Sequence, residues 1–395
     1  MIISIFSTII IIFSFFCSYI DYISHFYNNK EGAIMKNVLL TPGPLTTSNL
    51  VKQSMQKDLG TRDKDYENLV EETRQLLLEI ANADPLKYSA IFLQGSGTFG
   101  VESVLTSIIQ PSEKVLILSN GAYGVRMGSI CKQASVNYKL VQYSMVEKLN
   151  SQIIEEEISK PDITHVAYVH CETTAGILND IEEIQNLIHK YKKISIVDAM
   201  SSFASTPISL NKLGVDYLIT SSNKCLHGVP GLAIVFANKK HLSTCKNICH
   251  SLSLDLYSQY EYMEQHPGSF RFTSPTHVML ALNTAIKELI SQGGIRARHL
   301  HYLEIQKLIH EAMSSHKFDM LVCKADQCPV ITTFLYRQNF NFQDFYNYFK
   351  ENGFILYNGK LADYDAFRIG NIGDITENDI QVFKKILDQY FEEVK

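Results

Sequence analysis

The stretch that decides the fold is DYLITSSNKCLHGVPGLAIVFAN, residues 216–238, in which a connection containing glycine and proline joins two apolar runs. Lys224 is the single lysine of the stretch and follows the first run directly. Most loop lysines are simply solvated, but a lysine withdrawn from water loses its proton more easily and becomes a nucleophile. About ten residues separate the runs, fewer than a parallel crossover needs. We therefore predict that the two strands pair antiparallel or lie side by side through a tight loop.

Five more short apolar runs precede this pair, and amphipathic helical stretches separate most of them. The candidate strands are residues 90–93, 114–119, 138–143, 165–170, 194–199, 217–222 and 232–237. Apolar strands that alternate with helices are typical of a parallel sheet covered on both faces. We therefore predict an α/β fold with a mostly parallel, seven-stranded sheet.

The composition changes near residues 265–277, and long helical periods follow as far as residue 316. Strands near 330–335 and 354–357 and helices over 342–352 and 376–393 are predicted after them. This pattern predicts a large domain over residues 35–275 and a smaller α+β domain over 276–395. The run RARHLHYLEIQ, residues 296–306, is expected to be a solvated helix face.

Residues 1–20 are uncharged and long enough to span a bilayer. A secretory signal is poorly supported, because no basic region precedes the run and no small-residue cleavage pattern follows it. No Lys or Arg cluster lies close enough to orient a span. We interpret residues 1–34 as an extension outside the fold of the remaining chain, translated upstream of a start at Met35. A membrane anchor and a buried helix are the alternatives.

Charge and cysteine content limit the partners and the location. A net charge of −5 gives no basic field for nucleic acid. The eight cysteines are too sparse for a disulfide framework and show no metal-ligand spacing, so no metal site is predicted. A reducing, cytoplasmic location is expected, with a membrane anchor through residues 1–20 as the alternative.

A glycine-rich run, QGSGTFGVESVL at residues 94–105, follows a predicted strand and opens a predicted helix. The helix N-terminus offers free N–H groups to an anion. The run lacks the spacing of a P-loop or of a dinucleotide site, and a plain tight turn is the alternative.

Asp198 and Lys224 each follow a predicted strand of the same sheet. Ligands of such sheets bind outside the carboxyl ends of the strands, although Asp198 could also be a helix N-cap. A phosphate cradle, a carboxylate and a lysine are the parts that pyridoxal phosphate requires. The lysine bonds to the cofactor, the carboxylate keeps the ring nitrogen protonated, and the loop holds the phosphate.

Nine sequence blocks, in order from about residue 37 to 390, extend this interpretation. They are LLTPGPLTT, QGSGT, SNGAYGVR, HCETTAG, VDAMSSF, SSNKCLHGVPG, SLSLDLY, RFTSPTH and FRIGNIG. Together they resemble the class V aminotransferases of fold type I, which are enzymes that depend on pyridoxal phosphate. SSNKC, SLSLDLY and FRIGNIG favour the branch that transfers the amino group of 2-aminoethylphosphonate to pyruvate in phosphonate degradation.

The resemblance assigns roles residue by residue. Lys224 is expected to bond to the cofactor and move the proton, and Asp198 to pair with the ring nitrogen. Arg368 is expected to bind the anionic group of the substrate through its planar fork of donors, an ordinary salt bridge being the alternative. The other expected cofactor contacts are Ser96, Gly97, Thr98, Tyr123, Thr173, Met200, Asn223 and, from the second subunit of a homodimer, Thr273.

The same resemblance implies phosphonoacetaldehyde and L-alanine as products. An alanine:glyoxylate or serine:pyruvate aminotransferase uses the same cofactor apparatus and stays an alternative. A regulatory module that only binds the cofactor is less expected, because a binder needs none of the proton transfer that Lys224 provides. Small molecules are the expected ligands, with membrane contact only if the N-terminal extension is an anchor.

Overall fold

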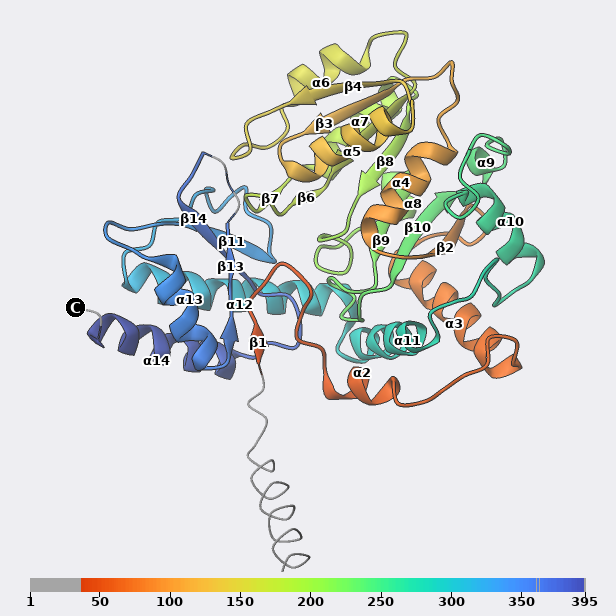
Figure 1. Ribbon diagram of the computed structural model, residues 1–395. Helices are drawn as coiled ribbons and strands as arrows, with labels where there is room; N and C mark the ends of the chain where they lie inside the picture. Colours follow the sequence, from red (N-terminus) through yellow and green to blue (C-terminus); the bar gives the residue numbers. More distant parts are fainter. Residues whose placement is uncertain (1–36, 360, 362, 394–395) are drawn as a thin grey trace, which may run out of the picture. The chain divides into compact units, whose positions relative to one another are not determined.

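Figure 1 shows the computed structural model, which describes residues 37–359, 361 and 363–393. The predicted extension over residues 1–34 lies outside the described residues. Within the described part of the chain, no helix is both long and apolar enough to cross a membrane.

All seven predicted strands form, and they lie in one sheet of order β2–β10–β9–β8–β5–β3–β4. Their bounds are β2 (Tyr88–Gln94), β3 (Val115–Ser119), β4 (Tyr138–Gln142), β5 (His165–Val169), β8 (Ile194–Asp198), β9 (Tyr217–Ser221) and β10 (Leu232–Asn238). Only β10 runs against its neighbours, β2 and β9, so the antiparallel pairing predicted for the Lys224 strand is confirmed. The remaining pairs are parallel.

Helices follow the strands of this sheet and share its core. They include α4 (Gly97–Ser107), α5 (Ala122–Gln133), α6 (Ser151–Ile158) and α7 (Ile181–Lys190). In α7, Ile181, Ile184 and Ile188 recur at helical spacing and are buried in the core. Asp180 caps α7 by accepting the Glu183 N–H. The predicted α/β architecture with a mostly parallel sheet is therefore confirmed.

Shorter elements and a helical layer complete this part of the chain. They are α2 (Asn49–Ser54), α3 (Lys64–Ile80), β6 (Cys171–Glu172), β7 (Ile177–Leu178), α8 (Leu210–Leu213), α9 (Lys239–Leu242), α10 (Leu256–Gln265) and α11 (Thr276–Ser291). The two-residue strands β6 and β7 pair antiparallel as a small hairpin. That hairpin supplies one wall of the site described below.

The smaller C-terminal domain is built around a three-stranded sheet of order β11–β14–β13. Its elements are α12 (Gly294–Ser315), β11 (Ile331–Leu335), α13 (Phe342–Glu351), β12 (Phe354–Ile355), β13 (Tyr357–Asn358), β14 (Ala366–Gly370) and α14 (Glu377–Glu393). Its core is rich in aromatic rings, among them Phe334, Phe345, Phe349 and Phe367. The sequence did not predict β14, the strand that carries Arg368.

Two segments connect the cores. The short strand β1 (Val38–Leu39) pairs parallel with β12, and Val38 lies in the C-terminal core. Conversely, α11 places Met279 and Leu282 in the core of the large sheet. The predicted domain boundary at residues 275 and 276 stays a prediction.

The expectation of a solvated helix face over residues 296–306 holds for one side of α12 only, where Arg296, Leu303 and Glu304 are exposed. Arg298, Tyr302 and Ile305 of α12 are buried. Tyr302 belongs to the core of the large sheet and Ile305 to the C-terminal core. The helix spans both cores, and this tertiary contact overrides the polar composition of the run.

Candidate active site

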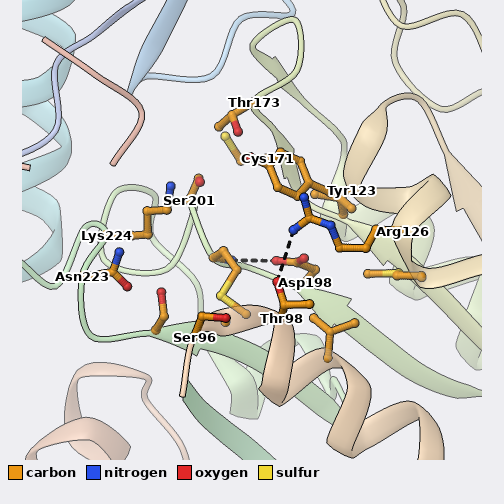
Figure 2. Close-up of a pocket in the computed structure, with 16 residues that line it drawn as sticks. Ser96, Thr98, Tyr123, Arg126, Cys171, Thr173, Asp198, Ser201, Asn223 and Lys224 are labelled. Atoms are coloured by element: carbon orange, nitrogen blue, oxygen red, sulfur yellow. Dashed lines mark hydrogen bonds between the residues drawn. The ribbon is translucent and has the colours of Figure 1, made fainter. Parts of the chain in front are cut away.

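A cavity of about 210 Å³ lies at the edge where β2, β3, β5, β8 and β9 reach their carboxyl ends (Figure 2). Nine predicted site residues line it: Ser96, Gly97, Thr98, Tyr123, Thr173, Asp198, Met200, Asn223 and Lys224. In Figure 2, Lys224 and Asn223 face the cavity from one side, and Tyr123 and Arg126 face it from the other. The topology of the sheet therefore brings together residues that are more than 120 positions apart in the sequence.

Lys224 lies in the turn that follows β9, with its ammonium group directed at the loop before α2. Its Nζ donates a hydrogen bond to the Pro42 carbonyl. The neighbouring Gly43 has φ +117°, and a Cβ there would lie 2.7 Å from the lysine Nζ. Burial has the largest effect on the pKa of Lys224 and lowers it, which favours the neutral amine. The loop thus holds Lys224 closely and requires glycine at residue 43.

Asp198 is the last residue of β8 and is buried. Its Oδ1 accepts the Met200 N–H at 2.9 Å. Burial raises the pKa of Asp198 to about 6, with Glu172 acting in the same direction and Lys224 in the opposite one. The N-cap interpretation is wrong, because the next helix, α8, begins only at Leu210 and is capped by Ser209.

The glycine-rich run forms the N-terminus of α4, with Ser96 as the N-cap residue. Its side chain makes no capping hydrogen bond, so the first N–H groups of α4 are not satisfied by this side chain. A Cβ on Gly97 would lie 2.4 Å from the Met200 sulfur, so the absent side chain permits this close approach. The run is therefore a helix N-terminus at the cavity wall, the arrangement that favours an anion.

Tyr123 and Arg126 lie one turn apart on α5, and the sequence analysis missed Arg126. The guanidinium carbon of Arg126 is 4.9 Å from the centroid of the Tyr123 ring, a cation–π distance. Its Nη1 also donates to Thr98 Oγ1 at 3.2 Å. The sequence carried no sufficient signal for Arg126, because the rotation of α5 decides whether this side chain faces the cavity. Cys171 and Ser201 also line the cavity without having been predicted.

Arg368 does not line the cavity but contacts a residue that does. Its Nη1 donates to the Thr173 carbonyl at 2.9 Å. Its Nε is buried and has no hydrogen-bond partner among the described residues. An unpaired buried donor is costly, which is the condition expected of a group that awaits an anionic ligand.

Thr273, the remaining predicted contact, is exposed on the segment before α11 and lies outside the cavity. Its neighbour Ser274 is buried and accepts the Tyr66 hydroxyl at 2.6 Å. Thr273 therefore cannot serve the cavity of its own chain in this arrangement. Its predicted role across a dimer interface stays a prediction.

Support for the Lys224 turn comes from α12. Arg298 is buried and donates through Nη1 to the Cys225 carbonyl at 3.0 Å. It also donates through Nη2 to Gln292 Oε1 at 3.0 Å. The residue after the lysine is thereby fixed to a helix that spans both cores.

Comparison with known proteins agrees with this geometry. Residues 46–366 match the family described as aminotransferase class-V. The chain belongs to the class V aminotransferases. A 2-aminoethylphosphonate–pyruvate transaminase of Phocaeicola vulgatus is 46% identical over 87% of this chain and 95% of its own length. Another relative of the same name, from Lysinibacillus sphaericus, is 45% identical over 89% of this chain and 96% of its own length.

A further relative of this aminotransferase is a longer protein. The bifunctional phosphonoacetaldehyde hydrolase/aminoethylphosphonate transaminase of Clostridioides difficile is 45% identical over 89% of this chain, which spans 56% of its length. Among solved structures, ureidoglycine–glyoxylate aminotransferase from Bacillus subtilis has a TM-score of 0.83 at 20% identity, covering 90% of this chain and 93% of its own. At that identity the likeness shows the fold alone.

Membership of the family implies pyridoxal phosphate, and the residues present fit that cofactor. The N-terminus of α4 suits a phosphate, because the Ser96 side chain does not cap its first N–H groups. The buried Asp198 carboxylate, the Tyr123 ring and the Lys224 amine line the same cavity. They provide a partner for a ring nitrogen, a stacking surface and an amine for covalent attachment.

Proposed function

We propose that this aminotransferase moves the amino group of 2-aminoethylphosphonate to pyruvate, giving phosphonoacetaldehyde and L-alanine, with pyridoxal phosphate as its cofactor. Two relatives that carry the transaminase name cover 87–89% of the chain at 45–46% identity. The observation that carries the proposal is the unpaired Nε of Arg368, held beside the cavity that Lys224 and Asp198 line.

Three groups of residues would hold the cofactor. Its phosphate would bind the amides and hydroxyls of Ser96, Gly97 and Thr98, with Asn223 as a further polar contact. The Thr173 hydroxyl would lie near the 3′-oxygen of the ring. Its ring would lie between Tyr123 and Met200, with Asp198 at the ring nitrogen. When bound, the cofactor supplies an electron sink that stabilises negative charge on the carbon bearing the amino group.

Lys224 would move the proton that amino transfer requires. Burial lowers the pKa of its amine, which favours the neutral form that can act as a base. Lys224 Nζ would take the proton from the amino-bearing carbon of the donor and return it on the cofactor side. In the second half of the reaction, in which pyruvate receives the amino group, Lys224 would transfer the proton in the reverse direction. One lysine therefore suffices for both halves of the reaction.

Arg368 would bind the phosphonate. The Thr173 carbonyl fixes one end of the guanidinium group, which leaves Nε and the other nitrogen for two-point contact with phosphonate oxygens. A phosphonate carries close to two negative charges near neutral pH, whereas a carboxylate carries one. The site is therefore proposed to distinguish amino donors by the charge of their anionic group as well as by their length.

We also propose a homodimer in which Thr273 reaches the cofactor phosphate of the partner subunit. Its exposure outside the cavity of its own chain supports this, and a two-fold dimer is the commonest arrangement of soluble oligomers. A cytoplasmic location stays a prediction from the sequence.

The decisive comparison is between 2-aminoethylphosphonate and β-alanine, its carboxylate analogue, with pyruvate as acceptor. One additional charge-assisted hydrogen bond contributes about 1.5–3 kcal/mol. We therefore expect kcat/KM to favour the phosphonate by about tenfold to a hundredfold. Serine with pyruvate and alanine with glyoxylate test the sister activities in the same assay. Equal kcat/KM for both donors, or a preference for serine, would overturn the phosphonate assignment.

A further inference from the structure

Glu172 is a fully buried carboxylate in the hairpin strand β6, next to Thr173. Its Oε1 accepts the Thr174 N–H at 3.1 Å and the Thr174 hydroxyl at 2.6 Å. Its Oε2 accepts the Tyr123 N–H at 3.3 Å. All three partners donate to the carboxylate, and these bonds oppose the increase in its pKa that burial causes.

These bonds attach the hairpin to the first turn of α5. The N-cap residue Gly121 makes no side-chain cap; instead the Ala122 N–H donates to Thr174 Oγ1 at 3.0 Å. A Cβ on Gly121 would lie 2.4 Å from the carboxyl carbon of Glu172. The helix is thus capped by a distant segment of the chain, and the capped turn is the one that carries Tyr123.

Arg368 is bonded to the residue that follows Glu172, because its Nη1 donates to the Thr173 carbonyl at 2.9 Å. From this neighbouring position the charge of Glu172 acts on Arg368, and it also acts on Asp198. Burial lowers the pKa of Arg368, and the Glu172 carboxylate opposes that decrease. Burial raises the pKa of Asp198, and the same carboxylate adds to that increase. Burial raises the pKa of Glu172 itself, and the bonds from Thr174 and Tyr123 oppose the rise. A negative charge that stabilises the guanidinium also opposes the approach of an anion to it.

We propose that Glu172 is a positioning residue whose carboxylate fixes the first turn of α5, and with it the Tyr123 ring, and whose charge limits the affinity of Arg368 for the substrate anion. The second part rests on the proposed phosphonate donor. Such a limit leaves kcat unaffected, because affinity shared equally by substrate and transition state does not contribute to kcat.

The test uses the holoenzyme and Glu172→Gln, which keeps the side chain's size and removes its charge. Ethylphosphonate, which has no amino group, serves as an inhibitor that reports anion affinity. We expect its inhibition constant to fall roughly threefold to tenfold, while kcat falls and the visible circular dichroism of the bound cofactor changes. Glu156→Gln on the exposed face of α6 is the matched control and should change none of these.

If Glu172 had only a structural role, Glu172→Gln would weaken ethylphosphonate binding or leave it unchanged. Either result would overturn the charge role. Thr174→Val, with Thr174→Ser as control, tests the positioning role while it keeps the Glu172 carboxylate and the bonds that it accepts from the Thr174 and Tyr123 N–H groups. We expect Thr174→Val to change the dichroism and lower kcat at an unchanged inhibition constant, and Thr174→Ser to behave as wild type. Unchanged dichroism in Thr174→Val would overturn the positioning role.

The variants Thr174→Val and Thr174→Ser still test the positioning role if Glu172→Gln does not fold. Failure of the proposed function is distinguishable from failure of this inference, because it shows in the wild-type enzyme. A wild type that ethylphosphonate does not inhibit refutes the phosphonate site and, with it, the charge role. The dichroism of the Thr174 variants then still decides the positioning role.

Discussion

At the scale of single residues, Asp198 couples stability to function. Burial raises its pKa from 3.8 to about 6. The folded, cofactor-free protein therefore binds more protons than the unfolded chain between about pH 4 and pH 6. Its stability falls as the pH rises through that interval, and the loss is fully present at pH 7. A protonated ring nitrogen beside the carboxylate would offset this cost.

We expect Asp198→Asn to raise the free energy of unfolding of the cofactor-free protein at pH 7 by about 2–3 kcal/mol. The amide oxygen can still accept the Met200 N–H, and the gain should vanish near pH 4. Activity should fall at least a hundredfold, because a neutral amide cannot stabilise a protonated ring nitrogen. Urea denaturation at both pH values and a transamination assay check this. A near-normal rate would show that the carboxylate has no part in the chemistry.

Arg368 gives a prediction about donor binding. In Arg368→Lys, a single ammonium cannot both contact the Thr173 carbonyl and offer a two-point fork. We expect the KM for the phosphonate donor to rise by about tenfold to a hundredfold, from the loss of one charge-assisted hydrogen bond. Steady-state kinetics with pyruvate as acceptor measure this change. Arg296→Lys, an exposed change on α12, is the control. An unchanged KM in Arg368→Lys would place the phosphonate elsewhere.

At the scale of elements, the loop between β1 and α2 links Lys224 to the strand of Arg368. Gly43 contacts the lysine side chain, and a Cβ on Gly370 of β14 would lie 2.3 Å from the Thr41 carbonyl oxygen. The Gly370 N–H also donates to the Leu40 carbonyl at 3.1 Å. This loop therefore contacts both Lys224 and β14 and can fix their positions relative to each other.

Gly43→Ala tests that role. A Cβ would overlap Lys224 Nζ, and φ +117° strains any side chain. We expect kcat to fall by about tenfold or more, and stability by roughly 1–3 kcal/mol from backbone strain. Gly294→Ala is the matched control, because Gly294 also has a positive φ of +74° but has nothing within 4 Å of its Cβ position. Equal losses of kcat in both variants would remove the loop from the mechanism.

The elements that the sequence predicted well are those with a strong local signal. Apart from the half-buried edge strand β4, the strands of the large sheet are mainly apolar runs, and their burial on both faces explains that pattern. The strand β14 was missed because Arg368 interrupts a run of only five residues. The hairpin strands β6 and β7, two residues each, carry no periodic signal.

The site shows the same limit. Residues at strand ends, such as Asp198 and Lys224, could be placed from the topology. Arg126 and Glu172 could not, because their positions depend on the rotation of α5 and on the hairpin that caps it. Arg298 was misjudged because its main partner, the Cys225 carbonyl, lies 73 residues away in the sequence. Contacts between distant segments thus account for each of these misses.

At the scale of the whole molecule, the surface around Thr273 supports a dimer. Leu252 and Phe272 have exposed fractions of 74% and 50%, and Arg271 connects them by donating to the Leu252 carbonyl and lying 5.0 Å from the Phe272 ring. Exposed apolar side chains beside a predicted cross-subunit contact favour an interface there.

We expect sedimentation to show a dimer, and Thr273→Val to weaken cofactor binding about tenfold by loss of one hydrogen bond to a phosphate. Thr61→Val, which changes an exposed threonine of the segment between α2 and α3, should not. A monomer that stays fully active on dilution would contradict the dimer.

The central claim is that Lys224 and Arg368 together make 2-aminoethylphosphonate the amino donor, and single-turnover absorbance of the cofactor tests it most directly. Mixing the holoenzyme with 2-aminoethylphosphonate, without pyruvate, should bleach the aldehyde form of the cofactor completely, and pyruvate should restore it. β-Alanine and serine should bleach it at least tenfold more slowly at equal concentration, and Lys224→Ala should not bleach on this timescale with any donor. Bleaching by serine as fast as by 2-aminoethylphosphonate, or bleaching by Lys224→Ala at the wild-type rate, would contradict the account.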